Sequence, residues 1–226
     1  MLLFFPFTLS LTISRASDLG AVLEKGWKQL ATSVENHSSL KIGIGLPAIP
    51  YTDPNYHSVV GNLLSMCEPH DCYFIVQMSY DRGQLLKFGG DRVKEKNVMQ
   101  FRDGVEDWFE FMKGLDLAVS TRIHGGMAGV AVGLPTLFLP TDFRIMELVN
   151  AMKLPHIPFE SFSSKNYTSL DQMMKAATND FAQFEANRRD RLKEYRRLLN
   201  SVGVEMDPAL VDILQQPDAS TTTTRE

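Results

Sequence analysis

The stretch that decides the fold is DLAVSTRIHGGMAGVAVG, residues 116–133. Residues 116–121 form a short apolar run, which predicts a buried strand, and residues 125–133 are rich in Gly, Ala and Val, which predicts a helix of small side chains. Small residues let a helix approach a sheet closely, although glycines lower its intrinsic stability. A strand that passes into such a helix is typical of a βα unit in a parallel sheet.

The same alternation of strand and helix extends on both sides of this stretch. Strands are expected at 41–46, 72–78, 97–101, 116–121 and 135–140, and helices at 59–66, 81–90, 105–113, 125–133 and 142–152. Strands that are apolar throughout, each followed by a helix, indicate a parallel sheet covered on both faces. The sequence therefore predicts an α/β fold, a doubly wound Rossmann-like parallel sheet.

The chain is expected to divide into four parts around this sheet. Residues 40–160 form the Rossmann-like domain, and residues 1–39 are a remnant of a further domain or a connecting strand and helix. Residues 161–214 form a helical extension with a long helix at 180–202, and residues 215–226 a disordered tail.

The charge balance argues against a nucleic-acid binder. The 226 residues carry 23 Lys and Arg against 27 Asp and Glu, a net charge of −4, whereas broad nucleic-acid binding needs a strong basic footprint. The basic residues of the long helix, Arg188 and Arg189 among them, alternate with acidic ones and are expected on a solvated face. Residues 1–13 form an apolar run that is too short to span a bilayer, so a membrane partner is not expected. The run has the length of a signal-peptide core but lacks a basic segment before it, which favours a buried strand over a signal peptide.

The cysteines and two sequons bear on the compartment. Cys67 and Cys72 are too few for a disulfide framework and are expected to be inert thiols in a loop at a helix end. With His70 they supply only three metal ligands, at a spacing unlike that of zinc knuckles, so no metal site is predicted. Glycosylation sequons begin at Asn36 and Asn166 and slightly favour the secretory pathway, such as the Golgi lumen, while the cytoplasm stays open.

The polar end of the deciding stretch, Ser120 to Gly126, carries the candidate chemistry. It lies between the carboxyl end of a strand and the start of a helix, where ligands bind in open α/β sheets. The first amides of a helix attract anions, and Gly125 and Gly126 would let a phosphate approach the backbone. Arg122 offers a fork for a carboxylate or phosphate, and His124 supplies an acid or base group beside it. The sequence therefore predicts a site for a small anion.

Residues 117–158 resemble the C-terminal signature of the polysaccharide pyruvyl transferase family. The resemblance rests on Ser-x-Arg-x-His at 120–124, Gly-x-Pro at 133–135, Asp142-Phe143-Arg144, Asn187-Arg188 near the start of a long helix, Tyr195, and Gly203-Val204. It implies one half of a glycosyltransferase-B-like fold, with residues 40–160 binding the donor. It also implies transfer of a pyruvyl group from phosphoenolpyruvate to two hydroxyls of a sugar or polysaccharide acceptor, forming a ketal and releasing phosphate without a further cofactor.

The resemblance assigns roles to individual residues. Arg122 and His124 would be catalytic, with His124 as general acid or base and Arg122 as a ligand of the donor. Two further roles rest on position in the chain rather than on the resemblance: Glu147, at i+3, would orient Arg144 or contact an acceptor hydroxyl, and His57, after the loop that follows the first strand, would contact the acceptor. The other expected donor ligands are Ser120, Thr121, Gly125, Gly126, Arg144 and, upstream, Arg15.

One departure from the family keeps other functions open. Only about 40 residues precede the strand at 41–46, where family members carry a whole further domain, so a fragment, a truncated product and an unusually short member are all compatible with the sequence. A nucleotide-sugar glycosyltransferase domain is one alternative, with Arg122 on the diphosphate and Glu147 on the ribose. A non-catalytic remnant that binds only a partner or a sugar is the other.

Overall fold

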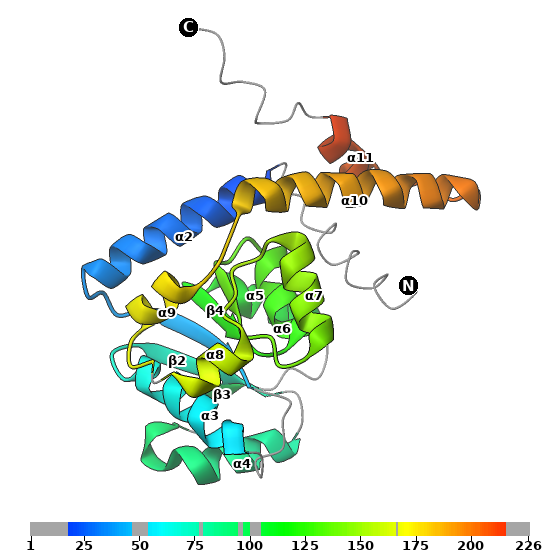
Figure 1. Ribbon diagram of the computed structural model, residues 1–226. Coiled ribbons are helices and arrows are strands. Elements are labelled where there is room, and N and C mark those ends of the chain that lie inside the picture. Colours follow the sequence, from blue (N-terminus) through cyan, green and yellow to red (C-terminus); the bar gives the residue numbers. More distant parts are fainter. Residues whose placement is uncertain are drawn as a thin grey trace, which may run out of the picture.

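The computed structural model describes residues 18–46, 54–76, 79–94, 97–99, 105–165 and 167–215. Within these residues a sheet of five parallel strands has the order β3-β2-β1-β4-β5 (Figure 1). The strands are β1 (Lys41–Gly45), β2 (Asp71–Ile75), β3 (Val98–Met99), β4 (Leu117–Ser120) and β5 (Thr136–Phe138). The predicted α/β fold with a doubly wound Rossmann-like sheet is confirmed.

Helices cover both faces of the sheet, as expected for strands that are apolar throughout. Ile42, Ile44 and Val119 point to one face and pack beneath α3, α8 and α9. Ala118 and Phe138 point to the other face, toward α5 and α6. The helices of this layered body are α3 (Pro54–Cys67), α4 (Ser79–Gly89), the 3₁₀ helix η2 (Gly90–Arg92), α5 (Val105–Lys113), α6 (Ile123–Ala131), α7 (Phe143–Met152), α8 (Phe159–Ser164) and α9 (Leu170–Ala176).

The small residues of α6 let this helix lie directly on the sheet. A Cβ at Gly126 would overlap the ring of Phe138, and a Cβ at Gly129 would lie 2.5 Å from the hydroxyl oxygen of Thr136. The helix ends near Gly133, whose φ of 77° is a left-handed conformation that glycine adopts without strain. The prediction that these glycines serve close helix–sheet packing is confirmed.

Two helices at the ends of the described chain pack on each other outside the sheet. α10 (Phe181–Ser201) is the long C-terminal helix predicted from the sequence, and its first half contacts α2 (Leu19–Glu35) and α7. Its second half extends away from the body and carries α11 (Pro208–Gln215) (Figure 1). Leu192, Met206 and Ile213 form a small apolar cluster that joins α10 to α11.

A buried ionic cluster joins α10 to α2. Arg188 is only 1% exposed and Arg189 7%, and the Nε–H groups of both donate to the Glu185 carboxylate, at 3.0 and 3.3 Å. The amide of Gly20 at the start of α2 donates to the same carboxylate at 3.1 Å. The expectation of a solvated face is therefore wrong for these two arginines, because Glu185 and the start of α2 replace water as their surroundings.

A disulfide links Cys67 at the end of α3 to Cys72 in β2. The expectation of inert thiols is therefore wrong. The turn over residues 68–70 reverses the chain and brings the two Cα atoms to 5.7 Å, which is within the usual range for a disulfide. The bond ties one helix to the amino end of its following strand.

The helical extension predicted at 161–214 contains α9, α10 and α11, although Leu170 and Met173 of α9 belong to the main core. Residues 1–17 and 216–226 lie outside the described residues. Within the described part of the chain, no helix has the length and apolar character that crossing a membrane requires.

Candidate functional site

The candidate site lies where the order of the strands reverses. β1 lies between β2 and β4; from β1 the chain proceeds outward to β3, returns to β4 and then continues outward to β5. Gly45 at the end of β1 pairs with Ser120 at the end of β4. Open α/β sheets bind ligands outside the carboxyl ends of their strands at such a switch point. The segment from Ser120 to His124 lies at this edge, as its position after a strand predicted.

Ser120 and Thr121 are buried and hold the loop between β4 and α6. The Ser120 hydroxyl donates to the Arg122 carbonyl oxygen at 2.7 Å and accepts from the Arg122 amide at 3.2 Å. The Thr121 hydroxyl donates to the Gly45 carbonyl oxygen at 2.9 Å, which ties the loop to β1. Both hydroxyls therefore fix the loop that carries Arg122, and their expected role as donor ligands stays a prediction.

Arg122 is the N-cap residue of α6, and its half-buried side chain reaches across to the neighbouring strand. Its Nε–H donates to the carbonyl oxygen of Leu46, directly after β1, at 2.9 Å. This bond holds the guanidinium over the boundary between the ends of β1 and β4. A guanidinium that is already oriented loses less conformational freedom when it binds a carboxylate or phosphate.

His124 is exposed in the first turn of α6, two residues after Arg122. The first hydrogen bond of the helix runs from the Gly126 amide to the Arg122 carbonyl oxygen at 3.2 Å. The amides of Ile123, His124 and Gly125 precede that bond, at the positive end of the helix dipole.

The two glycines after His124 face the sheet rather than the edge. The Gly126 amide is used within the helix, so the expectation that it cradles a phosphate is wrong. A Cβ at Gly125 would lie 3.0 Å from the Ser120 hydroxyl oxygen, and one at Gly126 would overlap Phe138. Close packing therefore explains why both positions are glycine.

The loop after β5 lies beside the Arg122 loop. The Thr141 hydroxyl donates to the Thr121 carbonyl oxygen at 3.3 Å. Asp142 caps α7 by accepting from the Ile145 amide at 3.0 Å, and it pairs with the exposed Arg144 guanidinium, also at 3.0 Å. Burial raises the pKa of Asp142, but hydrogen bonds from Arg144 and Ile145 outweigh it and bring that pKa below its ordinary value.

The partner of Arg144 differs from the one expected. Asp142 pairs with its guanidinium, whereas no hydrogen bond or ion pair joins Arg144 to Glu147, one turn further along α7, among the described residues. The expectation that Glu147 orients Arg144 is therefore wrong, and Glu147 instead presents an exposed carboxylate.

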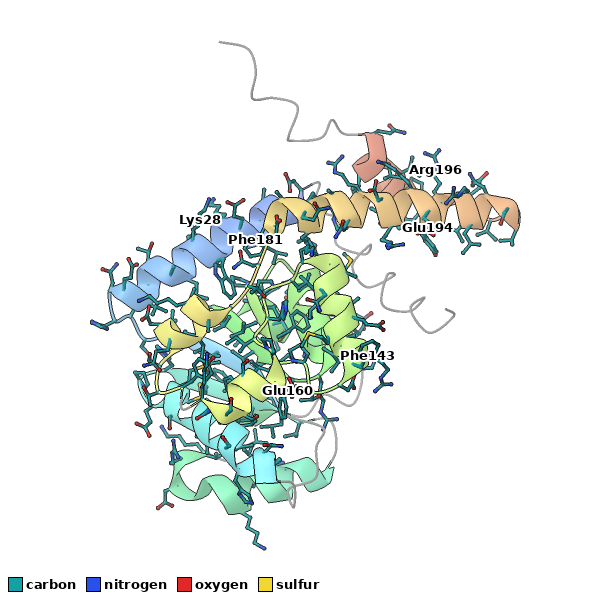
Figure 2. The ribbon with its side chains drawn as sticks, viewed as in Figure 1. Lys28, Phe143, Glu160, Phe181, Glu194 and Arg196 are labelled. Atoms are coloured by element: carbon teal, nitrogen blue, oxygen red, sulfur yellow. A yellow bond between two sulfur atoms is a disulfide. The ribbon has the colours of Figure 1, made fainter. Side chains whose placement is uncertain are left out.

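Phe143 is a candidate that sequence reasoning missed. Its side chain is 74% exposed at the start of α7 (Figure 2). The buried residues of α7 are Ile145, Leu148, Val149 and Met152, and Phe143 lies out of phase with that stripe, on the same side as Glu147. The sequence signal that could have identified it is an aromatic residue at a helix position that does not share the face of the apolar residues.

Two further residues, His57 and Arg15, complete the predicted set. His57 is exposed in the first turn of α3, which follows β1 in the chain, and its ring meets the Tyr56 ring edge-on with centroids 6.0 Å apart. It therefore belongs to the same edge of the sheet as Arg122. Arg15 lies outside the described residues.

The edge thus combines a fixed guanidinium, an imidazole, helix amides, a carboxylate and an exposed ring. Comparisons of the chain with family models, with curated proteins and with solved structures find no match. No group of three His, Cys, Asp or Glu suited to a metal ion occurs among the described residues. The arrangement suits binding of a small anion with a proton-transfer group beside it.

Proposed function

We propose that this chain is a polysaccharide pyruvyl transferase domain, which transfers the pyruvyl group of phosphoenolpyruvate to two hydroxyls of a sugar. The observation that carries the proposal is the pair Arg122 and His124 at the switch point between β1 and β4, with the guanidinium held by the Leu46 carbonyl oxygen. The Ser-x-Arg-x-His resemblance supports the same two residues.

In this proposal Arg122 binds the anionic donor. Phosphoenolpyruvate carries a carboxylate and a phosphate, and a guanidinium binds either through paired hydrogen bonds. The amides of Ile123, His124 and Gly125 and the positive end of the α6 dipole lie at the same place and favour negative charge. Ser120 and Thr121 keep the loop in this conformation through their bonds to the backbone.

His124 moves the protons. As a general acid it protonates the methylene carbon of the donor, which leaves C2 electron-poor. One sugar hydroxyl adds to C2 and loses its proton; the bond between C2 and the phosphate oxygen then breaks as a second hydroxyl closes the ketal. One hydroxyl proton returns to His124 and replaces the proton that it gave to the methylene carbon. The other hydroxyl proton leaves with the phosphate.

The exposed face of α7 supplies the acceptor side. The ring of Phe143 offers a flat apolar surface for the C–H face of a sugar, and the Glu147 carboxylate one turn away accepts hydrogen bonds from sugar hydroxyls. His57 lies at the start of α3 on the same edge and is the further acceptor contact. The loop contact between Thr141 and Thr121 brings this face beside the donor side.

The first test is thermal unfolding of the full chain with phosphoenolpyruvate or with a nucleoside diphosphate. A ligand at 100 times its Kd stabilises the native state by about 2.7 kcal/mol, a rise of about 5–10 °C in Tm. We expect this rise with phosphoenolpyruvate, its loss in Arg122→Ala and its retention in His124→Gln. Arg196→Ala, which removes the same charge from the exposed part of α10, is the matched control (Figure 2).

The second test is phosphate release from phosphoenolpyruvate with a panel of galactosides. We expect His124→Gln to bind the donor and to release phosphate about 10²–10⁴-fold more slowly than the wild-type chain. Stabilisation by the nucleoside diphosphate alone would instead indicate a glycosyltransferase domain. Stabilisation by neither ligand, or donor binding without phosphate release, would leave a non-catalytic binding domain.

A further inference from the structure

The sequon Asn36-His37-Ser38 lies at the exposed end of α2. Asn36 is the C-cap residue of that helix, and all three residues of the sequon are exposed. The Asn36 side chain makes no hydrogen bond among the contacts of the described residues. An oligosaccharide on its amide nitrogen would therefore extend into solvent without displacing a packed group.

The backbone of the sequon is fixed in a turn that ends the helix. The amides of His37 and Ser38 donate to the carbonyl oxygens of Val34 and Ser33, both at 3.0 Å, and His37 has a left-handed φ of 53°. This is the double hydrogen bond with which many helices end. Because the backbone satisfies its own hydrogen bonds, the side chains of Asn36 and Ser38 are not needed to hold the turn.

The disulfide is an independent observation that points to the same compartment. Cys67 and Cys72 are the two cysteines of the chain, and they are bonded to each other. Disulfides form and persist in oxidising compartments and are rare where glutathione keeps thiols reduced. Asn-linked glycans are added to proteins that enter the secretory pathway, the best known of these compartments.

We propose that Asn36 is an N-glycosylation site and that the chain matures in the oxidising lumen of the secretory pathway. The donor is an oligosaccharide linked to a polyprenyl diphosphate, and a host transferase supplies the catalysis. The Asn36 amide nitrogen gives one proton to a base of the transferase and bonds to C1 of the first sugar, while the bond between C1 and the diphosphate oxygen breaks and the lipid diphosphate leaves with its electron pair.

The site lies at the opposite edge of the sheet from Arg122. Asn36 comes shortly before Lys41, the first residue of β1, whereas Arg122 lies beyond the carboxyl ends of β1 and β4. A glycan on Asn36 would leave the candidate active site open. The proposal therefore does not rest on the pyruvyl transferase function.

The test is expression of the full chain behind an added cleavable secretory signal in eukaryotic cells. Peptide-N-glycosidase F in ¹⁸O water converts a glycosylated asparagine to labelled aspartate, which peptide mapping locates. We expect the label at Asn36, and one step of gel mobility lost in Asn36→Gln. Ser38→Ala, which breaks the sequon but keeps Asn36, should lose the same step, and Ser38→Thr, which preserves the sequon, should retain it.

Whether Cys67 and Cys72 are oxidised or reduced tests the second part of the proposal, that the chain matures in an oxidising lumen. We expect the glycosylated protein to unfold cooperatively and to react with maleimide only after reduction. An unlabelled Asn36 in the secreted chain would overturn the glycosylation site. Free thiols in the folded glycoprotein, or glycosylation only of aggregated chains, would show that the native fold does not mature in that compartment.

Discussion

Arginine occurs in two contrasting settings in this molecule. Arg188 and Arg189 are buried on α10 and share the carboxylate of Glu185, which also binds the amide at the start of α2. Arg122 is half-buried at the edge of the sheet, where its Nε–H donates to the backbone carbonyl oxygen of Leu46. The first arrangement neutralises charge within the fold, whereas the second places a guanidinium at an edge of the sheet where ligands bind.

The contrast indicates that burial and place in the fold, more than residue type, separate a structural arginine from a candidate ligand-binding one. A buried guanidinium is stable only beside a compensating charge. A guanidinium at the carboxyl edge of the strands instead lies where open α/β sheets bind ligands. The following substitutions test whether this distinction is correct.

The largest effect is expected for Glu185→Ala. It would leave Arg188 and Arg189 buried beside each other without their shared carboxylate, and breaking a buried pair typically costs about 3–5 kcal/mol. Urea unfolding measures the change in the free energy of unfolding. The control is Glu194→Ala, since Glu194 pairs with Arg191 on the exposed side of the same helix and should contribute no more than about 0.5 kcal/mol. If both variants lost the same free energy of unfolding, the buried ionic cluster would contribute no more to stability than an exposed ion pair.

The next effect concerns the helix that carries the candidate site. Gly126→Ala would force a Cβ into the ring of Phe138 and should destabilise the fold by about 1–3 kcal/mol. Gly61→Ala in α3 is the matched control, because a Cβ there meets nothing within 4 Å and should stabilise the helix by up to about 1 kcal/mol. Thermal unfolding compares them. If Gly126→Ala left the free energy of unfolding unchanged, close packing would not explain this glycine, and a role in ligand binding would again be the better explanation.

The sequence predicted the sheet because its evidence is local. Each apolar strand is followed within a few residues by a helix, and right-handed parallel connections leave few other arrangements. The position of Arg122 and His124 followed from the same local order, since the carboxyl end of a strand defines the edge of the sheet.

The features that the sequence did not predict depend on contacts between distant residues. Glu185 and Gly20 are 165 positions apart, so the sequence around Arg188 does not show that α2 packs over this charged cluster. The disulfide needed the turn at 68–70 to be placed between α3 and β2. The sequence predicted a helix from residue 125, which would have left the Gly126 amide available for a phosphate. The helix begins two residues earlier, and this amide makes its first internal hydrogen bond. The exact first residue of a helix depends on backbone conformation, which the sequence pattern does not fix.

A smaller change in stability is expected for Arg122→Ala. It removes the hydrogen bond to the Leu46 carbonyl oxygen at a half-buried position, which is worth about 1 kcal/mol. Urea unfolding without ligand measures this loss, and the ligand-induced rise in Tm is measured on the same protein. A loss as large as that of Glu185→Ala would show that Arg122 is a structural residue like Arg188.

The smallest effect is expected at Asp142, beside the candidate site. Its folded-state pKa is below the ordinary value of 3.8, so its contribution to stability is present above that value and is lost as the pH falls through the folded-state pKa. Asp142→Asn keeps a side-chain oxygen to cap α7 but loses the charge that pairs with Arg144. Because this pair is exposed to solvent, we expect a loss of only about 0.5 kcal/mol at pH 7.

The pH dependence distinguishes charge from capping at this position. The difference between Asp142→Asn and the wild-type chain should disappear well below pH 3.8, where the aspartate is protonated and uncharged. Asp142→Ala loses the cap as well and should remain about 1 kcal/mol less stable than the wild type even there. Urea unfolding at several pH values measures both differences. If Asp142→Asn differed from the wild type equally at all pH values, its effect would be due to altered packing, and Arg144 would not owe its orientation to the charge of Asp142.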